Sequence, residues 1–396
     1  MSISEWAGRL NNLANAVGGA SHLIGFDPEN LLELAKSSTQ LRDFGEPEWR
    51  QRYYRYCADL QSVDFSLTGL ILTKSRILRA LRNRLIVIDK MKREPSIGKE
   101  KILNPIFITG AARTGTSIFF ELLARDPHLR APLTWEAICP VPLKAHMTPE
   151  ETSGPEIAKN ERNLFVDIAP DFKRIHELGW DVPVECHELM EPSFANMKNE
   201  SGDDVSSRYQ WHKKILQVLQ HGSNSRQWLL KCCCHLPVVD ELFNVYPDAV
   251  IINIHRDPLK SISSMLHMGE ISASMLYRGS DRNYFGRVEE ILESFEKSRR
   301  KIIALREDSF YSERIFDIKF DDLMGNPTKT IRDLYERMGF DYKDYMDSLI
   351  NDYLLKKPRN KFKSESHFSE EHGFLKEEIK SRLGFYIDYY GIPSEE

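Results

Sequence analysis

Beyond residue 100 the chain alternates short apolar runs with segments of helical periodicity. The apolar runs span residues 105–110, 227–231, 248–255 and 314–320. Their length suits buried parallel strands. Most are followed by a segment with apolar positions three or four residues apart, which is typical of an amphipathic helix. Strands that alternate with helices predict an α/β fold, in which a parallel sheet carries helices on both faces.

The first hundred residues carry a helical pattern instead. In the longest segment, residues 66–94, apolar side chains recur at helical spacing, and four arginines give a basic face: Arg76, Arg79, Arg82 and Arg84. A helix of this kind could lie on a membrane surface, which leaves peripheral membrane contact open. We favour a helix that packs on the protein with its charged face in solvent.

These patterns predict two regions. Residues 1–100 are expected to form a helical region that packs on the core, and residues 101–396 an α/β domain. Residues 140–226 contain several prolines and the polar stretch "KNESGDDVSS", so they are predicted as helices and loops inserted between the first two strands. Because insertions at strand ends build substrate pockets in α/β proteins, this segment is expected to shape a substrate pocket.

Composition narrows the class of protein. The net charge of −5 does not suit a general nucleic-acid binder. No apolar run has the length of a membrane span, and the first residues lack a secretory signal, so we expect a cytoplasmic protein. The six cysteines form no C-x-x-C pair, which favours reduced thiols over disulfides or a metal site.

The stretch "GAARTGTS", residues 110–117, has the spacing of a phosphate-binding loop. Gly110, Gly115 and Ser117 fit the pattern, but Thr116 stands where nucleotide hydrolases have lysine. The stretch lies between a predicted strand and a predicted helix, so backbone N–H groups and Arg113 would face an anion. An ordinary glycine turn is the alternative.

The third predicted strand ends in a second basic position. Arg256 stands there beside Asp257, and an arginine at this place suits a second anion better than a magnesium ion. No apolar strand ends in a clear magnesium-binding aspartate, so no metal is predicted.

These motifs resemble the sulfotransferases that use 3′-phosphoadenosine 5′-phosphosulfate (PAPS), in their bacterial-type, broad-substrate branch. The resemblance rests on "RTGTS" at 113–117 and on Arg256 followed eight residues later by Ser264, and it covers about residues 100–390. It implies a P-loop-like fold and a nucleotide-binding site. The implied cofactor-binding residues are Arg113, Thr114, Gly115, Thr116, Ser117, Arg256, Ser264 and, in a late basic segment, Arg359 and Lys361.

The resemblance also implies catalytic roles. Arg113 and Lys231 would stabilise the transferring sulfuryl group, and Glu136 would be the general base. His235 and His187 are rivals for the base, but a lone histidine is more often structural. The chain departs from many relatives after Lys231, where Cys232-Cys233-Cys234 replaces a proline-containing pair.

The sequence therefore predicts a PAPS-dependent sulfotransferase that acts on a hydroxyl of a small-molecule, lipid or carbohydrate acceptor, without a metal and without nucleic acid. Two alternatives remain: a nucleotide kinase or hydrolase with a degenerate loop, and a non-catalytic module that binds 3′-phosphoadenosine 5′-phosphate (PAP). The sequence does not indicate the acceptor or the oligomeric state.

Overall fold

The computed structural model describes residues 3–141, 153–174, 178–197, 202–223, 226–278, 288–357 and 376–395. The chain divides into two compact units, each assembled from three stretches of sequence. The helical unit comprises Met1–Lys101, Pro132–Ser225 and Gly269–Phe285, and the sheet unit comprises Ile102–Ala131, Arg226–Met268 and Gly286–Glu396. The predicted division into residues 1–100 and 101–396 stays a prediction.

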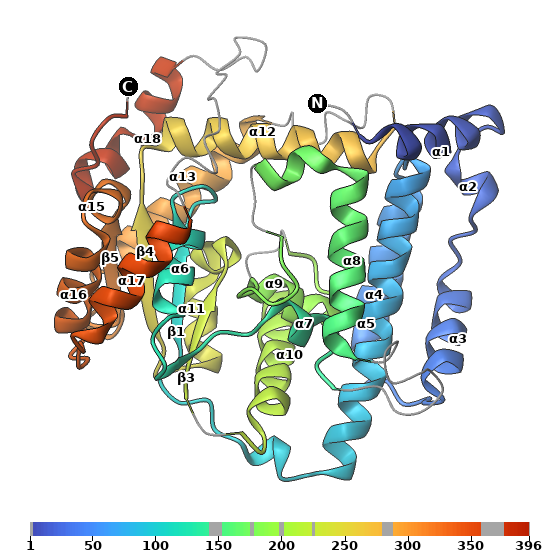
Figure 1. Ribbon diagram of the computed structural model, residues 1–396, viewed down its shortest axis with the longest axis horizontal. Helices are drawn as coiled ribbons and strands as arrows, with labels where there is room; N and C mark the ends of the chain where they lie inside the picture. The colour runs from blue at the N-terminus through green and yellow to red at the C-terminus, as the bar shows by residue number, and fades with distance from the viewer. Residues whose placement is uncertain are drawn as a thin grey trace. The chain divides into compact units, whose positions relative to one another are not determined.

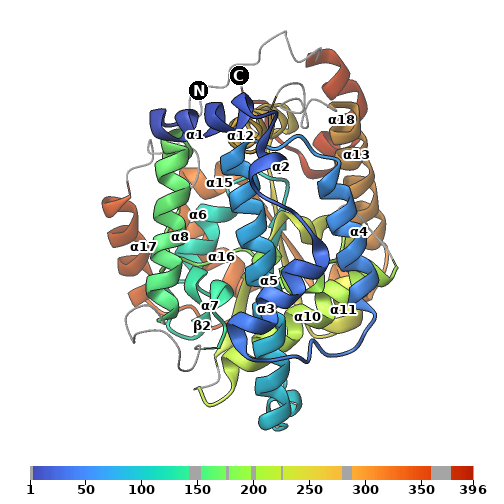
Figure 2. The ribbon, with the colours of Figure 1, turned by 90° about the vertical axis from the view of Figure 1, so that its right-hand side faces the viewer.

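The sheet unit contains five parallel strands, which confirms the predicted α/β fold. Figure 1 labels β1, β3, β4 and β5, and Figure 2 labels β2. Their order is β2-β3-β1-β4-β5. The strands are β1 (Ile106–Gly110), β2 (Leu129–Arg130), β3 (Gln227–Lys231), β4 (Val250–His255) and β5 (Ile315–Lys319). Four of them match the predicted runs, whereas the two-residue β2 has no pattern of its own.

Side chains alternate between the two faces of the sheet. One face, which includes Ile106 and Ile108 of β1, packs with helices α6, α16 and α17 in one buried cluster. On the other face, the ring of Phe107 lies 5.0 Å from His235 and 5.3 Å from Tyr246. The helices of this unit are α6 (Thr116–Leu123), η4 (Cys233–Val238), α11 (Val239–Val245), α13 (Val288–Leu305), α14 (Ser309–Ser312), α15 (Phe320–Gly325), α16 (Pro327–Arg337), α17 (Tyr345–Lys356) and α18 (Lys376–Tyr390), and α12 (Pro258–Leu276) begins in it.

The helical unit is organised around α5, which runs from Leu67 to Arg93 (Figure 2). Ser66 caps its start, because its Oγ accepts the N–H of Gly69 at 3.0 Å. Apolar residues of α5 pack with α3 and α4 around Trp49. The helices of this unit are α1 (Glu5–Ala16), α2 (Ala20–Leu23), α3 (Pro28–Thr39), α4 (Trp49–Gln61), α5, η1 (Ile97–Lys99), α7 (Thr134–Ile138), α8 (Gly154–Ile168), η2 (Pro170–Arg174), α9 (Cys186–Met190), η3 (Glu191–Ser193) and α10 (Asp203–Gln220).

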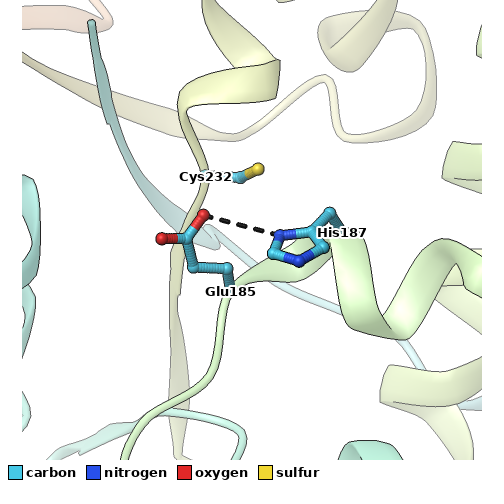
Figure 3. A group of neighbouring side chains, drawn as sticks. All are labelled: Glu185, His187 and Cys232. Carbon is cyan, nitrogen blue, oxygen red and sulfur yellow. Dashed lines mark ion pairs between the residues drawn. The ribbon is translucent and has the colours of Figure 1, made fainter. Parts of the chain in front are cut away.

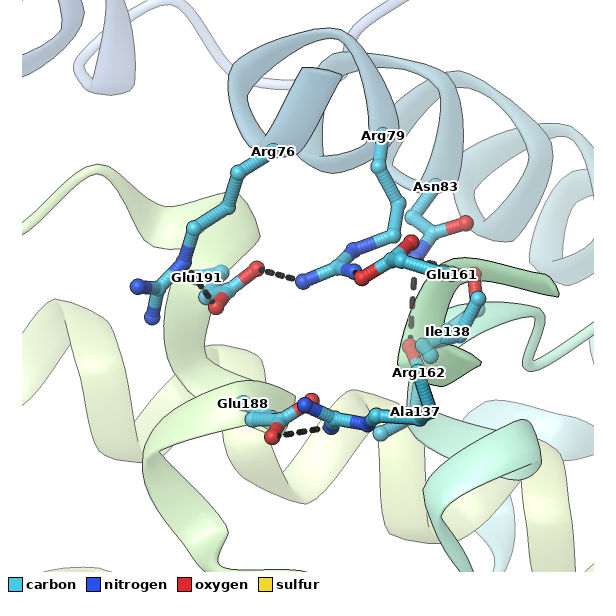
Figure 4. A network of polar contacts seen from close by, with 9 residues as sticks. All are labelled: Arg76, Arg79, Asn83, Ala137, Ile138, Glu161, Arg162, Glu188 and Glu191. Carbon is cyan, nitrogen blue, oxygen red and sulfur yellow. Dashed lines mark hydrogen bonds and ion pairs between the residues drawn. The ribbon is translucent and has the colours of Figure 1, made fainter. Parts of the chain in front are cut away.

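Helix α5 packs within the helical unit, but its basic face is solvated only in part: the side chain of Arg76 is 51% exposed, whereas that of Arg79 is 13% exposed. Arg84 is only 6% exposed, and its guanidinium lies 4.6 Å from the rings of both Trp49 and Trp211. Arg79 lies between the carboxylates of Glu161 and Glu191 (Figure 4). These arginines are internal structural groups because the helical unit supplies carboxylates, carbonyls and indole rings around them. No helix among the described residues has the length and apolar character needed to cross a membrane.

Candidate functional site

Three neighbouring strands of the sheet unit end at the same edge. In the strand register, Ile108 of β1 is opposite Lys231 of β3, and Gly110 of β1 is opposite Ile254 of β4. The carboxyl ends of parallel strands are where α/β proteins bind ligands. This edge therefore brings together the glycine loop after β1, Lys231 and the residues that follow β4.

The loop after β1 is closed by its own hydrogen bonds. Thr114 is buried, and its hydroxyl donates to the carbonyl of Ala111 at 2.8 Å. Gly115 has a φ of 88° and is the N-cap of α6. The N–H groups of the first turn of α6 therefore follow directly from the loop, an arrangement that favours an anion.

Arg113 has a backbone conformation that side chains rarely adopt, with a φ of 71°. Such a conformation costs about 1–3 kcal/mol and persists only where surrounding contacts hold it. Two contacts do so here. The Nε of Arg113 donates to Ser264 Oγ at 2.9 Å, and Arg256 Nη1 donates to the carbonyl of Arg113 at 2.9 Å. Burial, followed by the nearby positive charge of Arg256, lowers the pKa of Arg113.

Arg256 connects the end of β4 to the glycine loop. Besides its bond to the loop carbonyl, its guanidinium lies 4.0 Å from the ring centre of Phe320, the residue that follows β5. Phe320 also packs against Gly115, because a Cβ added at Gly115 would come within 2.7 Å of the ring. One aromatic ring thus supports both the arginine and the turn. Sequence reasoning missed Phe320, although its place after a neighbouring strand was a usable signal.

Lys231 is only 3% exposed, and its Nζ donates to Ser117 Oγ at 3.0 Å. The strand pairing continues past it: the N–H of Cys232 donates to the carbonyl of Ile108 at 3.2 Å, and Thr109 Oγ1 donates to the carbonyl of Cys232 at 3.0 Å. These bonds fix the backbone after Lys231. The loop of the sheet unit is therefore bordered by three cationic side chains, those of Arg113, Lys231 and Arg256, which suits a ligand with several negative charges.

The candidate bases Glu136 and His187 belong to the helical unit. Glu136 is 7% exposed and lies in α7, and its Oε2 accepts the N–H of Leu133 at 2.8 Å. This bond satisfies a backbone N–H at the start of α7, where the N-cap Leu133 has no side-chain acceptor, so the carboxylate also has a structural role. Asn83 of α5 fixes α7 from the other end by donating to the carbonyls of Ala137 and Ile138, each at 3.2 Å (Figure 4).

His187 lies on α9, next to a carboxylate. Its Nδ1 is 3.5 Å from Glu185 Oε2, and both side chains are partly exposed (Figure 3). A carboxylate beside an imidazole can orient the ring. The third candidate, His235, is fully buried in the sheet unit against Phe107, which indicates a packing role.

The predicted site residues fall into three groups. The structure brings the loop residues together with Lys231, Arg256 and Ser264 in the sheet unit. It places Glu136 and His187 in the helical unit. Arg359 and Lys361 lie outside the described residues.

A protein-family profile and individual known proteins both match this chain. Residues 105–344 match the profile of the Sulfotransferase family. The omega-hydroxy-beta-dihydromenaquinone-9 sulfotransferase Stf3 of Mycobacterium bovis is 25% identical over 304 residues, which are 72% of this chain and 75% of Stf3. Stf3 of Mycobacterium tuberculosis matches to the same extent.

Two crystal structures share the fold over nearly the whole chain. Sulfotransferase STF9 from Mycobacterium avium has a TM-score of 0.80 at 22% identity, covering 93% of this chain and 98% of STF9. Sulfotransferase STF1 from Mycobacterium tuberculosis has a TM-score of 0.72 at 22% identity, covering 90% of this chain and 98% of STF1.

Proposed function

This chain belongs to the sulfotransferase family, and from that premise we propose that it transfers the sulfuryl group of PAPS to a hydroxyl of a lipid-like acceptor. The observation that carries the proposal is the contact between Arg256 and the glycine loop. It joins the ends of β1 and β4 into one cationic site in the sheet unit. Two anionic groups of a single ligand would be held there, one by the loop and one by Arg256.

The residues of the sheet unit fit a bisphosphate ligand. In this proposal the 5′-phosphate is bound by the N–H groups that begin α6 and by the hydroxyls of Thr116 and Ser117. Thr114 and Gly115 hold the loop in shape, and Arg256 with Ser264 binds the 3′-phosphate. Arg359 and Lys361 stay proposed as further contacts to that phosphate. No metal is required, because the cationic side chains supply the positive charge.

The proposed reaction is a displacement at sulfur. PAPS supplies a sulfur atom joined to its 5′-phosphate through oxygen. The acceptor oxygen forms a bond to sulfur, and the bond from sulfur to the bridging oxygen breaks with its electron pair. Arg113 and Lys231 stabilise the negative charge that develops there, which accelerates transfer more than ground-state binding does. Glu136 accepts the hydroxyl proton, and His187 with Glu185 is the second candidate base.

The acceptor class comes from the relatives. Both Stf3 proteins are named for an omega-hydroxylated dihydromenaquinone. At 25% identity this name supports a class of acceptor and not a compound, so we propose a hydroxyl on a largely apolar molecule. A peripheral contact with a membrane and a cytoplasmic location both fit such an acceptor.

The test combines calorimetry with PAP and transfer from labelled PAPS to hydroxylated quinones, sterols, phenols and sugars. We expect PAP binding and transfer to apolar alcohols in preference to sugars. Arg256→Ala should weaken PAP binding roughly 10- to 100-fold, because charge-assisted hydrogen bonds are lost. Arg314→Ala is a matched control, since Arg314 also stacks on a phenylalanine and donates to a carbonyl but lies elsewhere on the sheet unit.

Two outcomes would replace the proposal. Magnesium-dependent ATP turnover without PAP binding would indicate a kinase or hydrolase. Tight PAP binding without transfer to any hydroxyl would indicate a binding module that has lost its activity.

A further inference from the structure

The segment after α18 returns to the end of β4 in the sheet unit. Gly391 has a φ of 59°, and the N–H of Ile392 donates to the carbonyl of Ile387 at 3.0 Å, which ends the helix. Lys319 Nζ donates to the carbonyl of Gly391 at 2.9 Å. Four residues later the N–H of Glu395 donates to Asp257 Oδ2 at 2.9 Å. The segment is therefore attached at both ends to residues that follow or end strands of the sheet.

These attachments place the carboxylate of Glu395 on Arg256. The Nε of Arg256 lies 2.6 Å from Glu395 Oε1, and Nη2 lies 2.7 Å from Oε2. About a fifth of each side chain is exposed. Two parallel N–H···O bonds of this kind are the geometry in which arginine binds a carboxylate or a phosphate.

This contact uses the edge of the guanidinium that an external anion needs. Nη1 is directed to the carbonyl of Arg113, and one face lies against Phe320. The Nε–Nη2 edge is the remaining bidentate edge, and Glu395 holds it. A phosphate cannot form two bonds to that edge while the carboxylate is in place.

We propose that Glu395 is an internal competitor of the cofactor, whose carboxylate must leave Arg256 before the 3′-phosphate binds. The inference rests on the proposed function, and it adds a means by which the segment 391–395 controls access to that site. The exchange is one anion for another, so Arg256 keeps a partner in both states. The positive charge of Arg256, which lies next to Arg113, is thereby balanced by the Glu395 carboxylate before the cofactor binds.

A neighbouring acidic group weakens the Glu395 contact. The carboxylate of Asp321 interacts with the charges of both Glu395 and Arg256, whereas Asp257 accepts the N–H of Glu395. Burial, followed by the negative charge of Glu395, raises the pKa of Asp321. Glu395 is thus attracted by the Arg256 guanidinium and repelled by the Asp321 carboxylate. In the proposed function, a phosphate on Arg256 would also contact Ser264.

The experiment measures PAP binding by calorimetry for the wild-type chain, Glu395→Gln and Asp388→Asn. Asp388 is an exposed residue of α18, so its substitution removes an equal charge from the helix that precedes the segment without touching Arg256. Adenosine 5′-monophosphate, which lacks the 3′-phosphate, is the second probe. Thermal unfolding verifies that all three proteins fold.

We expect Glu395→Gln to bind PAP about three- to tenfold more tightly than wild type, because release of one partly exposed bidentate pair no longer opposes binding. Affinity for adenosine 5′-monophosphate should be unchanged, and Asp388→Asn should match wild type with both probes. Equal or weaker PAP binding by Glu395→Gln, or an equal gain in Asp388→Asn, overturns the inference while leaving the proposed function intact. If no variant binds PAP at all, the proposed function fails, and the inference fails with it.

Discussion

Gly110, the last residue of β1, offers a direct test of how the loop is built. Its φ is 145°, a value that residues with a side chain rarely adopt. A Cβ at this position would lie 2.6 Å from the carbonyl oxygen of Ile254 and 2.9 Å from Thr114 Oγ1. Ile254 is paired with Gly110 in the sheet, so this carbonyl cannot move without disturbing the β1–β4 pairing. Gly110→Ala should therefore strain both the strand and the loop.

The magnitude follows from two contributions. An unfavourable backbone conformation costs about 1–3 kcal/mol. Steric overlap with a fixed group adds about 1–3 kcal/mol. The free energy of unfolding should fall by about 2–6 kcal/mol, a large part of the 5–15 kcal/mol typical of folded domains.

Alanine substitutions at two other glycines of the sheet unit separate the backbone contribution from the steric contribution. Gly339 has a φ of 69° but open space at the Cβ position, so its alanine variant should lose about 1–2 kcal/mol. Gly325 has neither constraint, so its variant should be neutral or slightly stabilised. Urea unfolding gives the stabilities, and calorimetry with PAP gives the effect on the loop. If Gly110→Ala lost no more stability than Gly339→Ala, the close approach of β4 to this glycine would be refuted.

Two further predictions concern the helical unit. Glu136→Gln keeps an oxygen that can accept the N–H of Leu133, so folding and PAP binding should be unchanged. Its kcat should fall at least about 100-fold, which is the range for loss of a general base. Full turnover in a transfer assay would exclude Glu136 as the base. Burial opposes ionisation of Glu188, but the charges of Arg162 and Arg79 outweigh it and lower its pKa to about 2. Because this folded-state pKa lies below the unfolded value of 4.5, Glu188 stabilises the fold above about pH 4.5, and this stability is lost as the pH falls toward 2. Glu188→Gln should be less stable than wild type at pH 6, with the gap narrowing at pH 3 in urea unfolding; a gap independent of pH would contradict the assignment.

The sequence predicted the fold well where each element had its own local signals. Asn326 is a typical N-cap residue and Pro327 a typical first-turn residue, so the start of α16 has local signals, and the Asn326 side chain accepts the N–H of Lys329 at 3.0 Å. The β2 strand was missed because two residues cannot show a period, and it pairs with β3 only through the fold. The η4 helix begins two residues after β3, because Cys232 Sγ accepts the N–H of Cys234 and starts a turn there, which no local sequence signal indicates.

The sequence predicted those residues of the candidate site that lie at or directly after the ends of strands. Parallel strands bring their carboxyl ends to one edge, so Gly110, Lys231 and Arg256 could be grouped without a structure. The contact between Arg256 and Glu395 could not, because 139 residues separate them and no motif joins them. The capping role of Glu136 could have been predicted from the sequence, since a glutamate three residues into a helix often accepts a hydrogen bond from the backbone N–H at the start of that helix.

The ion pairs of Arg79 also set a condition on biosynthesis. Arg79 is translated 82 residues before Glu161 and 112 residues before Glu191. At about 5–20 residues per second, roughly 6–22 seconds pass between Arg79 and Glu191. During that interval the nascent α5 helix presents arginines whose carboxylate partners do not yet exist, so the ion pairs of Arg79 cannot be completed until the chain has been synthesised past Glu191.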